Sequence, residues 1–116
     1  MAWQNYLSQT DRQVYERDNH VSKAAARMAL ETLARLLIRT RVPPSDHGAF
    51  DSNWTRYRFI IKRNGGMNDI VITAEDIVAE HLAQVDYAFG GPAHAVGDWL
   101  DNTAADIQRA VRQHLG

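Results

Sequence analysis

The stretch of sequence that decides the fold is residues 22–41, which read SKAAARMALETLARLLIRTR. Its apolar side chains recur at the three- and four-residue spacing of an amphipathic helix: Ala26, Ala29/Leu30, Leu33 and Leu36/Leu37. Residues with high helix propensity fill the stretch, and neither Gly nor Pro interrupts it. Ser22 is a suitable N-cap, and Pro43 and Pro44 end the helix soon after Thr40. We therefore expect a long central helix here.

The segment before the central helix has a shorter helical pattern. Its apolar and small side chains keep a helical spacing at Trp3, Tyr6/Leu7, Thr10 and Val14. Thr10 and Gln13 also fit a capping box, which would start a helix at that point instead. The polar run Asp18-Asn19-His20 predicts a break before the central helix. The alternative is one continuous helix from Trp3 to Thr40, and we prefer the break.

Residues 41–54 follow the central helix and contain two prolines, a glycine and several Ser, Asp and Asn residues. This composition predicts a loop, and loops of such length in compact domains are often functional. Phe50 and Trp54 are expected to hold the loop against the core. A third strand in this region is the alternative.

The clearest strand signals are residues 57–63 and 68–73, which are rich in β-branched and aromatic residues. A two-residue turn at Gly65-Gly66 would pair Lys62 with Asp69, Ile61 with Ile70, and Phe59 with Ile72. This register puts two sets of side chains on opposite faces: Tyr57, Phe59, Ile61, Ile70 and Ile72 on one, and Arg58, Ile60, Lys62, Asp69 and Val71 on the other. A lone hairpin is marginally stable in water, so we expect it to pack on the central helix.

Two further helices are predicted after the hairpin. Thr73 is a hydroxyl cap followed by first-turn carboxylates, and the buried stripe of its helix is Val78, Leu82, Val85 and Phe89. The Gly90-Gly91-Pro92 run would end that helix. Thr103 would cap the last helix, whose inner face is Ile107, Ala110/Val111 and Leu115. The alternative is a longer last helix capped by Asp98 that includes Trp99 and Leu100.

Together these segments predict one α+β domain over residues 1–116: a long central amphipathic helix, an antiparallel hairpin packed on it, and flanking N- and C-terminal helices. The chain has 116 residues and no cysteine, which excludes disulfide scaffolds, thiolate metal sites and cysteine nucleophiles. No apolar run is long enough to cross a bilayer, and the N-terminus lacks a signal-peptide pattern. We expect a soluble cytoplasmic protein that does not bind membranes.

Catalytic and cofactor motifs are weak. The five histidines form no metal-binding motif, and His94 with Asp98 is a single pair at ligand spacing. The pairs Gly65-Gly66 and Gly90-Gly91 lack the spacing of phosphate-binding loops. Asp46-His47 is the best acid–base candidate, and its nucleophile would have to be one of three hydroxyls: Ser45, Ser52 or Thr55. We therefore expect no metal, no cofactor and no enzymatic activity, with a small hydrolase as the third-ranked function.

The charges are divided unevenly along the chain. Residues 1–63 hold eleven of the thirteen basic and six of the fourteen acidic side chains, whereas residues 64–116 hold two basic and eight acidic ones. The candidate basic face consists of Lys23, Arg27, Arg35, Arg39, Arg56, Arg58 and Lys62. The candidate acidic face consists of Asp69, Glu80, Asp86, Asp98 and Asp101. Such an acidic field attracts a basic surface and steers encounter with it.

The charge pattern favours a non-enzymatic interaction protein, of the inhibitor or adaptor type, that binds another protein through a charge-polarised surface. A partner with a basic nucleic-acid-binding groove is one natural target for the acidic face. The alternative is a nucleic-acid-binding regulator that uses the basic helix and hairpin, although a net charge of −1 is low for that class. Self-association into a homodimer, acidic half against basic half, is a further interpretation.

Overall fold

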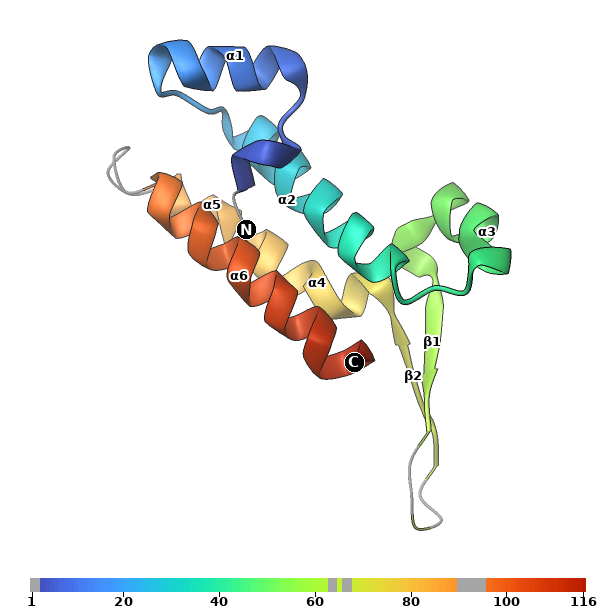
Figure 1. The fold of residues 1–116 in the computed structure, drawn as a ribbon. Coiled ribbons are helices and arrows are strands. Elements are labelled where there is room, and N and C mark those ends of the chain that lie inside the picture. The colour runs from blue at the N-terminus through green and yellow to red at the C-terminus, as the bar shows by residue number, and fades with distance from the viewer. Residues whose placement is uncertain (1–2, 63–64, 66–67, 90–95) are drawn as a thin grey trace.

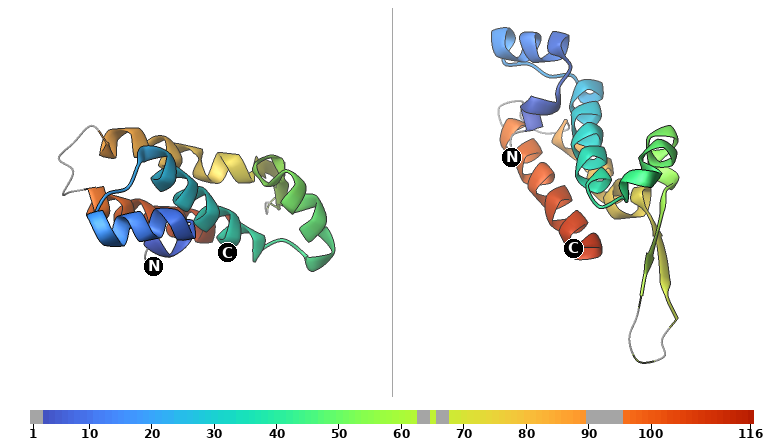
Figure 2. Two further views of the ribbon diagram at one scale, coloured as in Figure 1. Left: turned by 90° about the horizontal axis from the view of Figure 1, so that it is seen from above. Right: turned by 45° about the vertical axis from the view of Figure 1, so that its right-hand side comes forward.

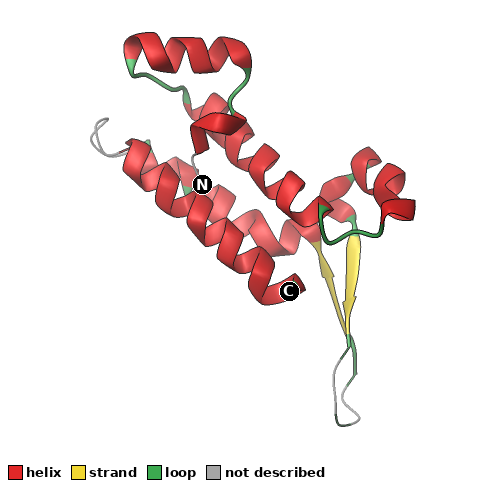
Figure 3. Cartoon of the chain, viewed as in Figure 1, coloured by secondary structure: helices red, strands yellow, loops and turns green. Residues whose placement is uncertain are grey.

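The computed structural model describes residues 3–62, 65, 68–89 and 96–116, and it shows a helical body with one projecting β-hairpin (Figure 1). The elements in chain order are η1 (Trp3–Tyr6), α1 (Gln9–Asp18), α2 (Lys23–Arg39), η2 (Pro44–Asp46), α3 (His47–Ser52), η3 (Trp54–Arg56), β1 (Arg58–Ile61), β2 (Ile70–Thr73), α4 (Ala74–Ala83), α5 (Val85–Ala88) and α6 (Val96–Leu115). The predicted α+β class is confirmed (Figure 3). Within the described residues, none of these helices has the length and apolar content needed to span a membrane.

Helix α2 is the predicted central helix. The Ser22 side chain accepts a hydrogen bond from the backbone N–H of Ala25 at 3.0 Å, and the helix ends against Thr40. Its inward face is buried over Ala25, Ala26, Ala29, Leu30, Leu33, Ala34 and Ile38. Helix α6 and the η1 turn both pack on α2, and α4 packs against both α2 and α6 (Figure 2). The predicted helix and its cap are confirmed, and so is its apolar stripe as far as Leu33; in the last turn Ile38 is buried, whereas the predicted Leu36 is 42% exposed.

The N-terminal segment is split as predicted, but its helix begins at a different residue. Ser8, and not Thr10, caps α1 by accepting a hydrogen bond from the N–H of Asp11. Asn19 ends the helix in the left-handed conformation with φ 50°, which produces the break before α2. Helix α1 buries no residue, and Tyr15 joins it to the body through an edge-on contact with Trp3.

The prediction of a loop at residues 41–54 is wrong, because the short helical segments η2 and α3 occupy most of this region and η3 begins at Trp54. Pro44 stands at the first position of η2, where its fixed φ and missing N–H suit a helical turn. Phe50 of α3 is fully buried, so the expected attachment to the core is confirmed. The alternative of a third strand is also wrong within the part of the chain that the structure describes, where the sheet has two strands.

The hairpin has the predicted antiparallel register. Phe59 lies opposite Ile72 and Ile61 opposite Ile70, and Lys62 pairs with Asp69 across the next position at 3.0 Å. Both strands are shorter than the predicted segments. The hairpin extends away from the helices and joins them at its base, where β2 contacts α4 (Figure 1). The sequence predicted that the hairpin packs on the central helix. In the structure, α4 is the nearer neighbour of the hairpin.

Thr73 connects the hairpin directly to α4, because it is both the last residue of β2 and the N-cap of α4. Its hydroxyl accepts the N–H of Asp76 at 3.1 Å, while its own N–H donates to the Asp76 carboxylate at 2.9 Å. This capping box confirms the predicted helix start and lowers the pKa of Asp76. Val78 and Leu82 are buried as predicted.

The C-terminal helices differ from the prediction in two places. A turn at Gln84 divides the expected single helix into α4 and α5. Thr103 is not a cap: it lies inside α6, and its buried hydroxyl donates to the carbonyl of Trp99 at 3.0 Å. Asp98, the alternative cap, also lies inside α6. The predicted inner face of α6 is confirmed, and the predicted Gly90-Gly91-Pro92 stop lies outside the described residues.

Candidate functional site

Most cations of the candidate basic face are paired within the chain. On α2, three of the four form ion pairs: Lys23 with Asp86, Arg27 with Glu31, and Arg39 with Asp51. Hydrogen bonds from Arg39 and Lys23 lower the pKa of Asp51 and of Asp86, respectively. Arg56 and Arg58 are exposed and make no ion pair within the described residues. The charge that remains open to a partner therefore lies mainly at the base of the hairpin, and on α2 Arg35, which is half-buried, is the cation without an ion pair among the described residues.

The residues of the candidate acidic face are not brought together. Asp86, Asp98 and Asp101 lie on α5 and the beginning of α6, whereas Asp69 lies on the hairpin at the other end of the molecule (Figure 1). Glu80 is exposed on α4 between them. Lys62 lies beside Asp69 as the predicted register requires, and the fold also brings Lys23 of α2 to Asp86, a pairing that the sequence did not predict.

The hairpin presents apolar side chains to solvent. On its outward face Ile60 and Val71 lie directly opposite each other and are 63% and 58% exposed. Arg58, Lys62 and Asp69 surround this pair on the same face. We call these five residues the hairpin surface. Since the described sheet has two strands, the outer edges of both strands also have unpaired backbone groups.

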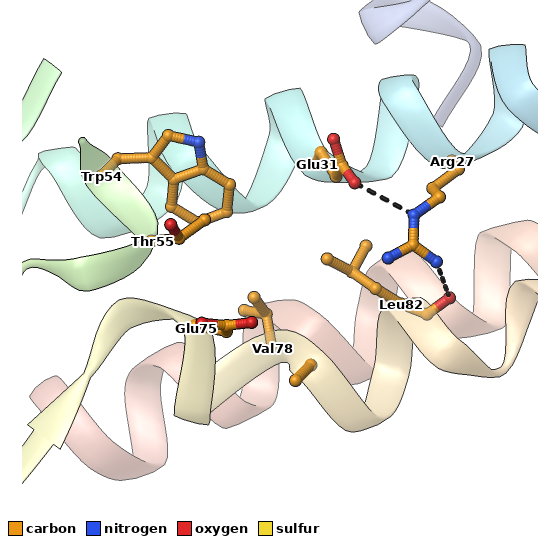
Figure 4. A pocket seen from close by; sticks show the side chains of 8 residues that line it. Arg27, Glu31, Trp54, Thr55, Glu75, Val78 and Leu82 are labelled. Carbon is orange, nitrogen blue, oxygen red and sulfur yellow. Dashed lines mark hydrogen bonds and ion pairs between the residues drawn. The ribbon is translucent and has the colours of Figure 1, made fainter. Parts of the chain in front are cut away.

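A pocket of about 220 Å³ lies between α2, η3 and α4. Its walls are Arg27 and Glu31 of α2, Trp54 and Thr55 of η3, and Glu75, Val78, Ala79 and Leu82 of α4. Trp54 lies at one end of the pocket and Arg27 at the other (Figure 4). The Arg27 guanidinium donates to Glu31 at 3.1 Å and to the carbonyl oxygen of Leu82 at 3.5 Å.

No protein-family model, curated protein or solved structure matches this chain. The function must therefore be inferred from the surface residues themselves.

Sequence reasoning missed this pocket. It assigned Trp54 to the core and Glu75 to the first turn of a helix, and both assignments hold without excluding a second role. The lining residues come from three segments that lie at least twenty positions apart in the chain. No local pattern brings such segments together, so only the tertiary structure reveals the pocket.

The catalytic candidates do not form a relay. The Asp46 carboxylate accepts a hydrogen bond from the Tyr57 hydroxyl at 2.9 Å, and His47 donates through Nε2 to the carbonyl of Val42 at 3.0 Å. Burial and the contact with Asp46 raise the pKa of Tyr57. Ser52 donates to the carbonyl of Ala49, so it makes no hydrogen bond to His47. These contacts fix the α3 turn and do not activate a nucleophile.

The described residues contain no cluster of three or more His, Asp or Glu side chains that could hold a metal ion. His94, the predicted partner of Asp98, lies outside the described residues. His81 is half-buried on α4.

Proposed function

We propose that this chain is a non-enzymatic interaction protein that binds another protein, with the hairpin surface as its main contact. The observation that carries this proposal is the exposed Ile60–Val71 pair on a hairpin that extends beyond the helices. Isolated exposed apolar residues are common, but a cross-strand pair bordered by charges on a projecting element is typical of an interface. The small helical body then serves as the support that holds the hairpin in position.

The expected contribution of this pair to binding follows from its exposure. Fully burying a Val or Ile side chain contributes roughly 1.5–3 kcal/mol. Because each side chain is about 60% exposed, each can contribute about 1–2 kcal/mol on binding. Since about 1.4 kcal/mol is a factor of ten in affinity, loss of both contacts should weaken binding by about thirtyfold or more.

The exposed charges of this chain indicate a second property of the partner, which is a complementary charge. Arg58 and Arg56 at the hairpin base and Glu80, Asp98 and Asp101 on the helices are exposed and make no ion pair in the described parts of the chain. Complementary charges on the partner would speed encounter and make binding sensitive to salt. An inhibitor or adaptor acts by occupying a surface, so an apolar contact and complementary charges are sufficient for that role.

The test is affinity capture from the native host with three forms of the protein, followed by mass spectrometry. The double variant Ile60→Thr/Val71→Thr keeps the β-branched side chains that suit a strand and replaces the ethyl group of Ile60 and one methyl group of Val71 by a hydroxyl. The matched control is Met28→Ser, which alters a side chain of α2 that is 64% exposed. We expect a protein that the wild type and Met28→Ser both capture and the double variant loses. Equal capture by all three forms would contradict the proposal.

Nucleic-acid binding is the second candidate, and the exposed, unpaired Arg56 and Arg58 favour it. A mobility-shift assay at low salt distinguishes the two functions. The protein-binding proposal predicts no shift, whereas a shift that Arg56→Ala/Arg58→Ala removes would make nucleic acid the partner.

A further inference from the structure

We propose that the pocket between α2, η3 and α4 is a receptor for one arginine side chain of the partner protein. This inference rests on the proposed function, because it names a second contact with the same kind of partner. It adds a site whose ligand chemistry is defined by the residues around it.

The size of the pocket favours a single side chain. Sites for drug-sized molecules occupy roughly 300–1,000 Å³. The volume of about 220 Å³ is smaller than that range and suits one long side chain. A pocket of this kind beside an exposed surface is where a central contact residue of a partner inserts.

The floor of the pocket suits an aliphatic stem. Val78, Ala79 and Leu82 of α4 supply apolar walls, and Val78 and Leu82 are almost fully buried beneath it. Long basic side chains lay their methylene groups along apolar surface and keep the charged head near water. A short acidic or polar side chain would leave this surface uncovered.

The charges of the pocket place the head group at the Trp54 end. Arg27, at the opposite end, is neutralised by Glu31 and by the Leu82 carbonyl, so it does not attract an anion. Glu75 is exposed and has no hydrogen-bond or ion-pair partner among the residues that the structure describes. The open charge of the pocket is therefore negative, and a cation that binds beside Trp54 and Glu75 stays away from Arg27 (Figure 4).

Arginine fits these groups better than lysine does. A guanidinium is planar, so it can stack on the Trp54 indole while donating two N–H groups to the Glu75 carboxylate. It is also more weakly hydrated than an ammonium group and loses less on entering a partly enclosed site. The combination of an aromatic ring, a free carboxylate and an apolar floor is the environment that an arginine side chain uses best.

The experiment is a titration with Nα-acetyl-L-arginine amide, followed by ¹H–¹⁵N NMR of the whole protein. Nα-acetyl-L-citrulline amide, which has nearly the same shape but no charge, is the matched ligand control. We expect saturable millimolar binding of the arginine compound, with shifts centred on the Trp54 indole and the amides of Thr55 and Val78. The citrulline compound should bind at least about fivefold more weakly.

Two variants test the role of the free carboxylate. Glu75→Gln should weaken binding of the arginine compound by about fivefold, whereas Glu80→Gln, on the same helix but outside the pocket, should leave it unchanged. Equal binding of both compounds, equal effects of the two variants, or the lack of saturable binding would each overturn the inference. The hairpin variant Ile60→Thr/Val71→Thr should bind the arginine compound normally. If it does, while partner capture is insensitive to the hairpin, the proposed function alone fails.

Discussion

Replacing Ser22 by alanine should lower the stability of the whole protein, whereas the same change at Ser8 should not. Both serines are N-caps whose side-chain oxygens accept a backbone N–H, at 3.0 Å for Ser22 and 3.2 Å for Ser8. Loss of such a cap costs about 1 kcal/mol of helix stability. The two helices differ in what they bury: α2 carries much of the core, and α1 buries no residue.

The expected change in melting temperature follows from the chain length. With an unfolding entropy of about 2.1 cal/mol/K per residue, a chain of 116 residues loses about 4 °C for each kcal/mol. Ser22→Ala should therefore lower Tm by about 4 °C, because α2 cannot unfold without exposing the core. Ser8→Ala should change Tm by less than about 1 °C, because α1 can unfold alone while the body stays folded.

Thermal unfolding followed by circular dichroism measures the global effect, and hydrogen exchange of the α1 amides measures the local one. In Ser8→Ala, the amides of α1 should exchange several-fold faster while those of α2 keep their protection. An equal fall in Tm for both variants would refute the reasoning, since it would mean that α1 unfolds together with the core. An unchanged Tm in Ser22→Ala would mean that the cap of the central helix contributes nothing.

Two further predictions concern the core and the response to acid. Leu33→Ala should cost about 2–5 kcal/mol in urea unfolding, because Leu33 is fully buried, while Leu36→Ala, at a side chain 42% exposed on the same helix, should cost less than about 1 kcal/mol. Asp86 has a lowered pKa in the folded state, so its pairing with Lys23 stabilises the protein above the ordinary carboxyl pKa and is lost as the pH falls below about 4. Asp86→Asn should therefore flatten the fall of Tm between about pH 4 and pH 2, and an unchanged pH profile would show that the pair is not formed in solution.

Local patterns were sufficient to predict α2, the hairpin and the start of α4. The three-and-four spacing of α2 and the alternation of the hairpin strands each depend on neighbours in the chain, and both predictions are confirmed. The hairpin register could be predicted because the two glycines leave one pairing that keeps Phe59 and Ile72 on the same face. The capping box at Thr73 was visible for the same reason.

Prediction failed where tertiary contacts overruled local composition. The Pro- and Gly-containing segment 41–54 forms helical turns because burying Phe50 and packing it edge-on to Tyr57 favours a compact path. Thr103 resembles a cap, but its hydroxyl bonds back to Trp99 inside a longer helix.

The candidate site was the least predictable part. The uneven charge of the two halves suggested two separate poles, yet Lys23 and Lys62 pair with acids of the other half. Ion pairs depend on distances between segments, which charge counts along the chain do not contain. The pocket at Trp54 depends on three segments, and its free carboxylate, Glu75, was fully explained by its place in a helix.

The direct junction at Thr73 has a consequence for partner choice. Because one residue ends β2 and begins α4, no flexible linker separates the hairpin from the helix that carries Glu75, two positions further on. The Ile60–Val71 pair and the pocket are thus held at a fixed distance and a fixed angle to each other. A partner whose apolar patch and arginine lie at a different separation can bind either the Ile60–Val71 pair or the pocket, but not both. Such a partner gains no avidity from a second contact.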